Sequence, residues 1–196
     1  MQIVIFGGTG FLGKRLTRAF ETKYRVYSST RFNNGKIADS EFYFDFETPT
    51  SIPKHVLQSA DIVINCIGYA NVDMCEKFPK LAWKLNVEFP KYLAELFSSS
   101  NCRLIHISTD HFIQSLKDDT YKIFPINEYG KSKLAGEQFI SKKSNHTIIR
   151  TNFFGYSNKY DNLFSWLIKN LSMGVKVNGF TDIRSEERRV GKECVS

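Results

Sequence analysis

The feature that most restricts the fold of this chain is a glycine-rich turn close to its N-terminus. The β-forming run Ile3-Val4-Ile5-Phe6 leads directly into the sequence GGTGFLG, and apolar residues then recur at helical spacing. In such a strand–turn–helix unit, glycines let the chain turn tightly, approach a pyrophosphate and pack the helix on the sheet. The N–H groups and partial positive charge of the helix N-terminus favour phosphate. The turn therefore predicts a dinucleotide site formed by Gly7, Thr9, Gly10, Phe11, Leu12 and Gly13. A glycine turn without a ligand is the alternative.

Strand-like and helix-like segments alternate along the rest of the chain. Short apolar runs of strand type lie at residues 24–27, 42–44, 61–67, 104–107 and 147–150. Helical spacing covers about 79–98 and 128–141. Apolar strands that alternate with helices form a parallel sheet covered on both faces. We expect an α/β fold with a doubly wound, Rossmann-type parallel sheet. Residues 1–151 would be the NAD(P)-binding domain, and residues 152–183 only the start of a small C-terminal substrate lobe.

The last residues of the chain differ from the rest. Residues 184–196 read RSEERRVGKECVS, without apolar periodicity, and resemble the translation of a sequencing-adapter oligonucleotide. We expect a non-native tail on a C-terminally truncated chain, which by itself would be inactive. A native charged helix is the alternative.

Composition excludes several classes of function. The formal charge is +7, but Lys and Arg are dispersed, which argues against a nucleic-acid partner. No apolar run approaches the roughly 20 residues of a membrane span, and the N-terminus lacks a secretory signal. We expect a cytoplasmic protein that does not bind a membrane. The four cysteines lack metal-like spacing, so we expect inert thiols and no metal.

The end of the second strand indicates which dinucleotide binds. Sites that prefer NAD usually carry an acid there, which accepts from the ribose 2′-hydroxyl. This strand instead ends Ser28-Ser29-Thr30-Arg31. Arg31 can form charge-assisted bonds to a 2′-phosphate, and the preceding hydroxyls can add more. The sequence favours NADPH, with NADH possible; in the alternative interpretation Arg31 is a solvated loop charge.

A tyrosine and a lysine mark a candidate reducing centre. Tyr129 and Lys133 are four residues apart and therefore share one face of a helix. A nearby ammonium is expected to lower the pKa of the phenol and make it a usable acid. Ser108-Thr109-Asp110 follows an apolar strand, and ligands gather at the carboxyl ends of parallel strands. A solvated Tyr–Lys pair is the alternative.

Five segments in order carry a family resemblance: GGTGFLG, VINCIGYANVDMCEKFPKLAWKLNVEFPKYLAE, LIHISTD, NEYGKSKLAGEQ and IIRTNFFG. Together they resemble the dTDP-4-dehydrorhamnose reductase family, a branch of the extended short-chain dehydrogenases, over residues 1–183. The resemblance implies hydride transfer from NADPH to the 4-keto group of a nucleotide-linked deoxysugar, for the synthesis of cell-surface polysaccharide sugars. It also implies a homodimer in the full-length protein.

The resemblance assigns roles to residues at matching positions. Tyr129 would donate the proton, Lys133 would orient the nicotinamide ribose and tune Tyr129, and Thr109 would hydrogen-bond the carbonyl. Asp45 and Phe46 fall where relatives contact the adenine. Cys66, Ile67 and Gly68 match the segment that runs beneath the cofactor ribose.

The chain departs from the family pattern after Ser-Thr-Asp. It has His111-Phe112-Ile113 where Tyr-Val-Phe is usual, and Gln114-Ser115 in place of Asp-Gly. These departures leave the sugar and the nucleotide base open. Two other functions also stay open: a non-catalytic nucleotide-binding or regulatory member of the same fold, and a sugar-nucleotide epimerase or dehydratase.

Overall fold

The computed structural model describes residues 1–31, 39–46, 52–98, 100–115, 121–142, 145–152 and 163–177. The contacts within it divide the chain into two compact units, residues 1–153 and 154–196. The non-native tail predicted at 184–196 lies outside the described residues, as does much of the predicted substrate lobe. The domain boundaries at 151 and 183 therefore stay predictions.

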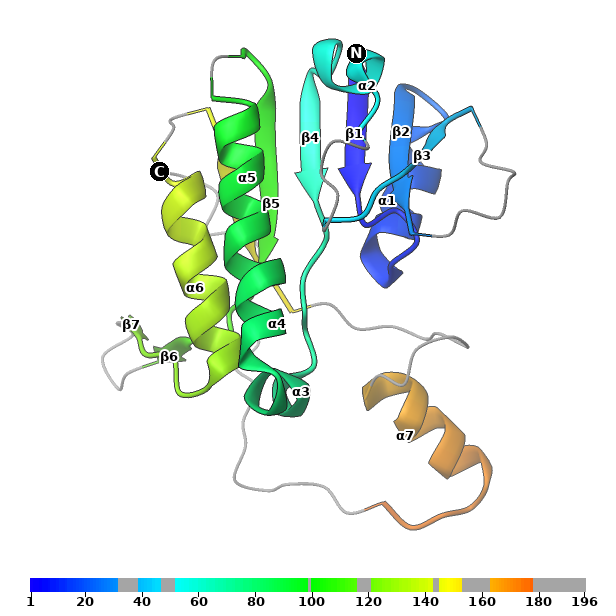
Figure 1. The fold of residues 1–196 in the computed structure, drawn as a ribbon. Coiled ribbons are helices and arrows are strands. Elements are labelled where there is room, and N and C mark those ends of the chain that lie inside the picture. Colours follow the sequence, from blue (N-terminus) through cyan, green and yellow to red (C-terminus); the bar gives the residue numbers. More distant parts are fainter. Residues whose placement is uncertain are drawn as a thin grey trace. The chain divides into compact units, whose positions relative to one another are not determined.

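The first unit is built on a six-stranded parallel sheet (Figure 1). Its strands lie in the order β3-β2-β1-β4-β5-β8, and each neighbouring pair runs in parallel. Their bounds are β1 Gln2–Phe6, β2 Arg25–Thr30, β3 Glu41–Tyr43, β4 Ile62–Asn65, β5 Arg103–Ser108 and β8 Thr147–Arg150. The chain order reverses at β1, so β1 and β4 flank the switch point where ligands of such sheets bind. The predicted α/β class and parallel sheet are confirmed.

Helices cover the two faces of this sheet. On one face α1 (Phe11–Phe20) packs against Ile3, Ile5 and Val26. On the other lie α2 (Lys54–Gln58), α5 (Phe89–Leu96) and α6 (Glu128–Ile140), with α5 and α6 side by side in front of β5 (Figure 1). Near the first turn of α6 lie α3 (Val72–Lys77) and α4 (Pro79–Trp83). A short antiparallel pair, β6 (Ile113–Ser115) and β7 (Tyr121–Ile123), precedes α6.

Aromatic rings form the centre of the larger core. Phe6, at the end of β1, is completely buried, and its ring centroid lies 5.1 to 5.6 Å from those of Phe42, Phe44 and Phe89. These edge-to-face contacts join β1, the β3 region and α5. Each stabilises the core beyond the effect of the apolar area that it buries. The strand that leads into the glycine turn is therefore fixed from both sides.

The helix predicted over about 79–98 is one continuous stretch with an irregular middle. Between α4 and α5, Lys84–Glu88 forms the π-helical turn η2. Gly136 of α6 packs on this turn so closely that a Cβ atom there would overlap the backbone carbonyl of Asn86. The periodicity of the sequence did not predict the π turn, because it depends on this contact between distant segments.

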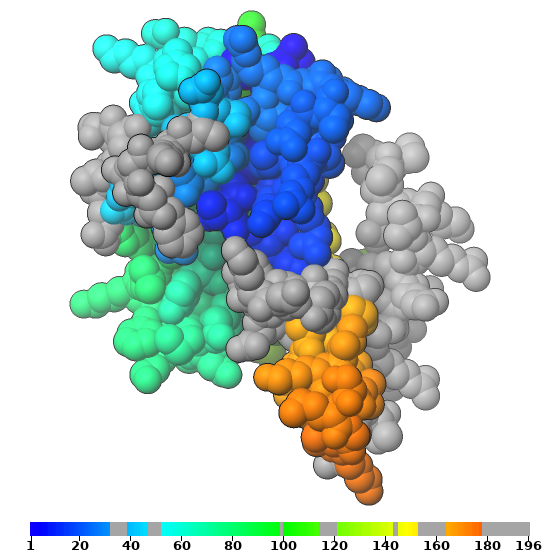
Figure 2. Space-filling model, turned by 90° about the vertical axis from the view of Figure 1, so that its right-hand side faces the viewer, coloured from blue at the N-terminus to red at the C-terminus, as the bar shows by residue number. Residues whose placement is uncertain are grey.

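The second unit contributes one described helix, α7 (Leu163–Ser172). Several of its large apolar side chains are exposed, with Trp166 at 48% and Leu171 at 60%. Figure 2 shows α7 in orange and the surface of the N-terminal strand–turn–helix unit in blue. Among the described helices, none is long and apolar enough to cross a membrane.

The close packing of Gly136 on η2 gives the first prediction. Gly136→Ala should lower the free energy of unfolding by about 1–3 kcal/mol, because a backbone carbonyl cannot rotate away as a side chain can. Thermal and denaturant unfolding followed by circular dichroism measure this loss. Gln138→Ala, at an exposed position of the same helix, is the control and should change stability by less than about 0.5 kcal/mol. Equal stability of the two variants would contradict the close contact.

Candidate functional site

The glycine turn adopts the geometry that its sequence predicts. Gly7 has φ +88°, a left-handed conformation that glycine adopts without strain. The N–H of Gly7 donates to Ser29 Oγ at 2.8 Å, and Gly10 N–H donates back to the Gly7 carbonyl at 2.9 Å. A Cβ at Gly13 would overlap the same carbonyl. The first turn of α1 is thereby held against the end of β1, and Gly10, its N-cap, brings no capping side chain. Such a helix start can receive a phosphate.

Arg31 and the hydroxyl side chains before it differ in their exposure to solvent. Arg31 follows β2, its side chain is exposed, and in the described part of the chain it forms no hydrogen bond or ion pair. Ser28, Ser29 and Thr30 are buried, and Ser29 is used to hold Gly7. Ser29 is therefore part of the turn, and the expectation that these hydroxyls join Arg31 around a 2′-phosphate stays a prediction. Arg31 remains available at the strand end.

The predicted adenine contacts lie after β3. Asp45 and Phe46 are both half-buried. The Phe46 ring packs against Phe89 and Tyr92, with ring centroids 5.3 and 6.4 Å apart. Phe46 therefore also has a packing role that would fix the position of its neighbour Asp45.

The segment after β4 lies close to the predicted reducing centre. Ile67 N–H donates to Asn65 Oδ1 at 3.0 Å, which fixes the chain where it leaves the strand. A Cβ at Gly68 would lie 3.6 Å from Lys133 Nζ. Burial raises the pKa of the Cys66 thiol to about 12, although the Lys133 ammonium acts in the opposite direction. Cys66 is thus an inert thiol, as expected, and Gly68 faces the lysine across a narrow gap.

Thr109 and Tyr129 lie close together between β5 and α6, and Lys133 lies one helical turn further along α6. The Thr109 hydroxyl lies close enough to the Tyr129 phenol to hydrogen-bond its phenolate form and so favour that form. Thr109 Oγ1 also accepts the backbone N–H of His111 at 3.1 Å, which leaves its own proton for the tyrosine oxygen. Lys133 is only 5% exposed and donates to the Ile107 carbonyl at 2.7 Å. The structure thereby excludes the alternative of a solvated lysine.

The electrostatics of this trio differ from the sequence-based expectation. Burial raises the pKa of Tyr129, and the hydrogen bond from Thr109 opposes that rise. The prediction that Lys133 lowers it is not met: Lys133 is not among the groups that shift the pKa of Tyr129, and its ammonium lies instead against the Ile107 carbonyl. Burial also lowers the pKa of Lys133 to about 8, against the attraction of Glu137. Desolvation is therefore the main cause of the pKa shifts of both Tyr129 and Lys133.

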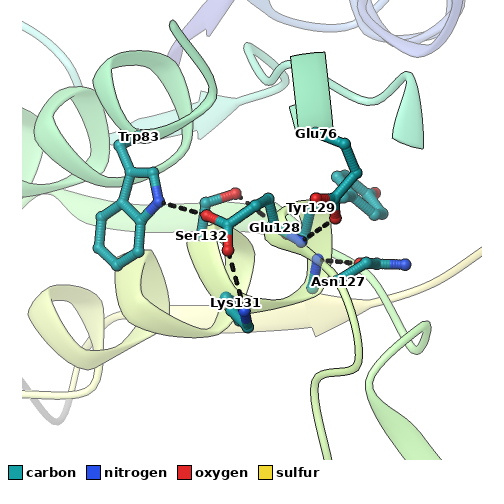
Figure 3. A network of polar contacts seen from close by, with 8 residues as sticks. Glu76, Trp83, Asn127, Glu128, Tyr129, Lys131 and Ser132 are labelled. Carbon is teal, nitrogen blue, oxygen red and sulfur yellow. Dashed lines mark hydrogen bonds and ion pairs between the residues drawn. The ribbon is translucent and has the colours of Figure 1, made fainter. Parts of the chain in front are cut away.

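The first turn of α6, which carries Tyr129, is held by polar contacts with two other helices (Figure 3). Asn127 is the N-cap and accepts the Gly130 N–H at 2.8 Å. Glu76 of α3 accepts the Glu128 N–H at 2.7 Å. The Glu128 carboxylate accepts the Trp83 indole N–H of α4 at 3.1 Å and binds Lys131 at 2.9 Å. These contacts satisfy N–H groups that every helix start leaves free.

Asn86 is a residue of the site that the sequence analysis missed. It is completely buried in η2, where its amide bonds both the N–H and the carbonyl of Tyr69, at 2.8 and 3.1 Å. It also donates to Ser132 Oγ at 3.0 Å. Asn86 therefore joins the loop after β4 to the helix that carries Tyr129. An amide within an otherwise apolar helical stretch was the signal available in the sequence.

The bond between Thr109 and Tyr129 gives the second prediction. Thr109→Val should raise the pKa of Tyr129 further, by up to about one pH unit, because the phenolate loses a donor. Tyrosinate absorbance followed against pH, with Tyr129→Phe as the subtraction, measures the change. Thr109→Ser keeps the hydroxyl and should titrate like the parent. A valine variant that titrates at an unchanged or lower pH would show that this bond is unimportant.

Comparisons with known proteins agree with this geometry. The model of the family described as RmlD substrate binding domain matches residues 1–184. The dTDP-4-dehydrorhamnose reductase of Aggregatibacter actinomycetemcomitans is 36% identical over 180 residues, which are 86% of this chain and 58% of the relative. The enzyme of the same name from Salmonella typhimurium is 28% identical over 86% of this chain and 56% of its own length.

A solved structure shows the same fold with a nucleotide bound. The dTDP-4-dehydrorhamnose reductase of Bacillus anthracis, in complex with NADP, has a TM-score of 0.68 and 27% identity, over 89% of this chain and 61% of that one. The chain thus spans a little over half the length of the curated relatives named above. Since the family model covers nearly all of the chain, this protein belongs to the RmlD substrate binding domain family.

Proposed function

We propose that this chain is the nucleotide-binding part of an NADPH-dependent reductase that acts on a nucleotide-linked 4-keto-6-deoxysugar, in the synthesis of cell-surface polysaccharide sugars. The observation that carries the proposal is the buried Lys133 one helical turn from Tyr129, with the Thr109 hydroxyl close to the Tyr129 phenol. The dTDP-4-dehydrorhamnose reductase relatives and the NADP complex support it. A cytoplasmic location and a homodimer stay predictions.

The residues present fit a dinucleotide. The start of α1 brings no side-chain cap, and Gly13 leaves no Cβ between that helix and the Gly7 carbonyl. A pyrophosphate can therefore approach the backbone N–H groups closely. Arg31 is an exposed cation at the end of β2, where a 2′-phosphate would need one. When bound, the reduced nicotinamide supplies the hydride.

The chain's own residues hold the proton and transfer it to the substrate. A raised pKa keeps Tyr129 protonated near neutral pH, which is the state that an acid needs before a carbonyl is reduced. As the substrate oxygen gains electron density, the phenol gives it a proton, and Thr109 donates a hydrogen bond to the phenolate that remains. The Lys133 ammonium is held by the Ile107 carbonyl and lies near Gly68, where it would orient the nicotinamide ribose.

Two other functions compete with the reductase. A regulatory module has no need of a buried lysine one helical turn from a tyrosine with a threonine hydroxyl close to it, and these side chains are present here. An epimerase or dehydratase would use a similar tyrosine and lysine, so the reaction assay separates it from a reductase. Net consumption of NADPH with a keto-sugar nucleotide supports reduction alone.

The third prediction tests the preference for NADPH. Arg31→Ala should weaken NADPH binding by on the order of 1.5–3 kcal/mol, about 10- to 150-fold, because a charge-assisted phosphate contact is lost. NADH binding should change little. Fluorescence titration of this chain with both cofactors measures the two affinities. Arg25→Ala is the matched control, since Arg25 is an exposed arginine at the opposite end of the same strand. Equal affinity of the parent for the two cofactors would refute the assignment.

The fourth prediction tests the acid. In the full-length gene product that contains residues 1–183, Tyr129→Phe should reduce turnover of a 4-keto sugar nucleotide by roughly 10²- to 10⁴-fold. NADPH affinity should stay close to that of the parent. Tyr121→Phe, at an exposed tyrosine of β7, controls for loss of a hydroxyl elsewhere. If the Tyr129 variant keeps near-normal turnover, Tyr129 is not the acid and the regulatory function gains support.

A further inference from the structure

A second buried polar pair lies beside the trio, and the mechanism above does not use it. Asn65 ends β4, His106 lies opposite it in β5, and both side chains are completely buried. Asn65 Nδ2 lies 3.1 Å from His106 Nδ1. Because Asn65 Oδ1 already accepts the Ile67 N–H at 3.0 Å, the amide nitrogen is the atom that faces the imidazole. The orientation of this amide is thereby settled by the backbone.

This orientation fixes the tautomer of His106. An amide nitrogen only donates, so His106 Nδ1 must accept, and a neutral imidazole then carries its proton on Nε2. Burial and the Lys133 ammonium both lower the pKa of His106 well below its usual value. A protonated ring would also set an Nδ1–H against the amide N–H. Hydrogen bonding and electrostatics therefore agree that His106 is neutral.

His106 shares its side of the sheet with the lysine. Leu104, His106 and Ser108 alternate as the buried residues of β5, and Leu104 packs in the core with α5 and α6. Lys133 enters from α6 and reaches the Ile107 carbonyl between two of them. His106 Nε2 and Ser108 Oγ are both buried without a hydrogen-bond partner within the described residues. Such atoms are rare in protein interiors.

The neutral state of His106 affects the charged groups around it. Lys133 is the cation next to it, and one helical turn further on Glu137 is paired with Arg150 of β8 through its carboxylate, at 2.6 Å. Cys66, at the end of β4, is an uncharged thiol because burial raises its pKa to about 12. A second positive charge on His106 would oppose the ammonium of Lys133 with little solvent to screen it.

We propose that His106 is a positioning residue of this site: through Asn65 it ties the backbone at Ile67 to β5, and its neutral ring is the uncharged polar neighbour that lets Lys133 keep its proton. This inference rests on the proposed function only for the role of Lys133 in catalysis. The link from Ile67 through Asn65 to His106 belongs to the fold itself, and the Ile107 carbonyl that holds Lys133 directly follows His106 in β5. Together they join the segment beneath the expected ribose to the residue that would orient it.

The experiment compares three variants of the 196-residue chain. His106→Gln keeps an acceptor for Asn65 and a donor, His106→Leu removes both, and Leu104→Ala is the matched control, a buried residue on the same face of β5 that should lower thermal stability without touching Lys133. The titration of Lys133 is followed by NMR of labelled lysine side chains, assigned with Lys133→Met. NADPH affinity is measured across the same pH range. Long-range nitrogen NMR of the parent reports the tautomer of His106.

The expected results separate positioning from stability. His106→Leu should shift the titration of Lys133 to a pH below about 8, because an apolar neighbour desolvates the ammonium further. NADPH affinity should fall by roughly 3- to 10-fold, the equivalent of one hydrogen bond. The glutamine variant should restore both quantities, and Leu104→Ala should leave both unchanged. His106 should stay in the neutral Nε2–H form to a pH well below that at which a free imidazole gains its proton.

Two outcomes would overturn the inference. One is a His106 that carries its proton on Nδ1 or titrates near neutral pH. The other is an unshifted Lys133 in the leucine variant. If the parent fails to bind NADPH, the proposed function fails instead, while the two NMR measurements still decide the role of His106.

Discussion

The interaction on which the site depends is the burial of one charged amine. Lys133 is almost inaccessible to solvent, and its ammonium keeps a partner only because the Ile107 carbonyl of β5 lies 2.7 Å away. A buried charge without such partners would cost several kcal/mol. The packing of α6 on the sheet must therefore place the lysine within a few tenths of an ångström. Gly136, which lets α6 approach η2, serves the same requirement.

Polar side chains around the lysine connect neighbouring elements by hydrogen bonds. Asn86 ties the loop after β4 to α6, Asn65 ties the same loop to β5, and Glu76 ties α3 to the start of α6. Each bond satisfies a group that burial or a helix terminus would otherwise leave unpaired. The proposed site, which would join a cofactor segment and an acid from different parts of the chain, would need this rigidity.

The agreement between sequence and structure depends on how local each feature is. The turn from Gly7 to Gly13 follows from neighbouring residues, and the structure has the left-handed Gly7 and the tight helix start that it requires. The alternation of apolar strands and helices likewise predicted the parallel sheet. The order β3-β2-β1-β4-β5-β8 needs the whole fold, as does the π turn at Lys84–Glu88. The structure leaves the roles of Arg31 and Asp45 toward a cofactor as predictions.

The sequence by itself determined the fold class, the glycine turn and the placing of Tyr129 and Lys133 on one helix, because each is encoded by spacing along one strand or one helix. Only the tertiary structure decided the protonation behaviour of that pair. A pKa depends on desolvation and on charges from other elements. The pKa of Tyr129 is therefore raised, whereas the sequence alone predicted that it would be lowered. The same holds for His106, whose neutral state follows from an amide on the next strand and an ammonium on a helix, neither of which is near it in the sequence.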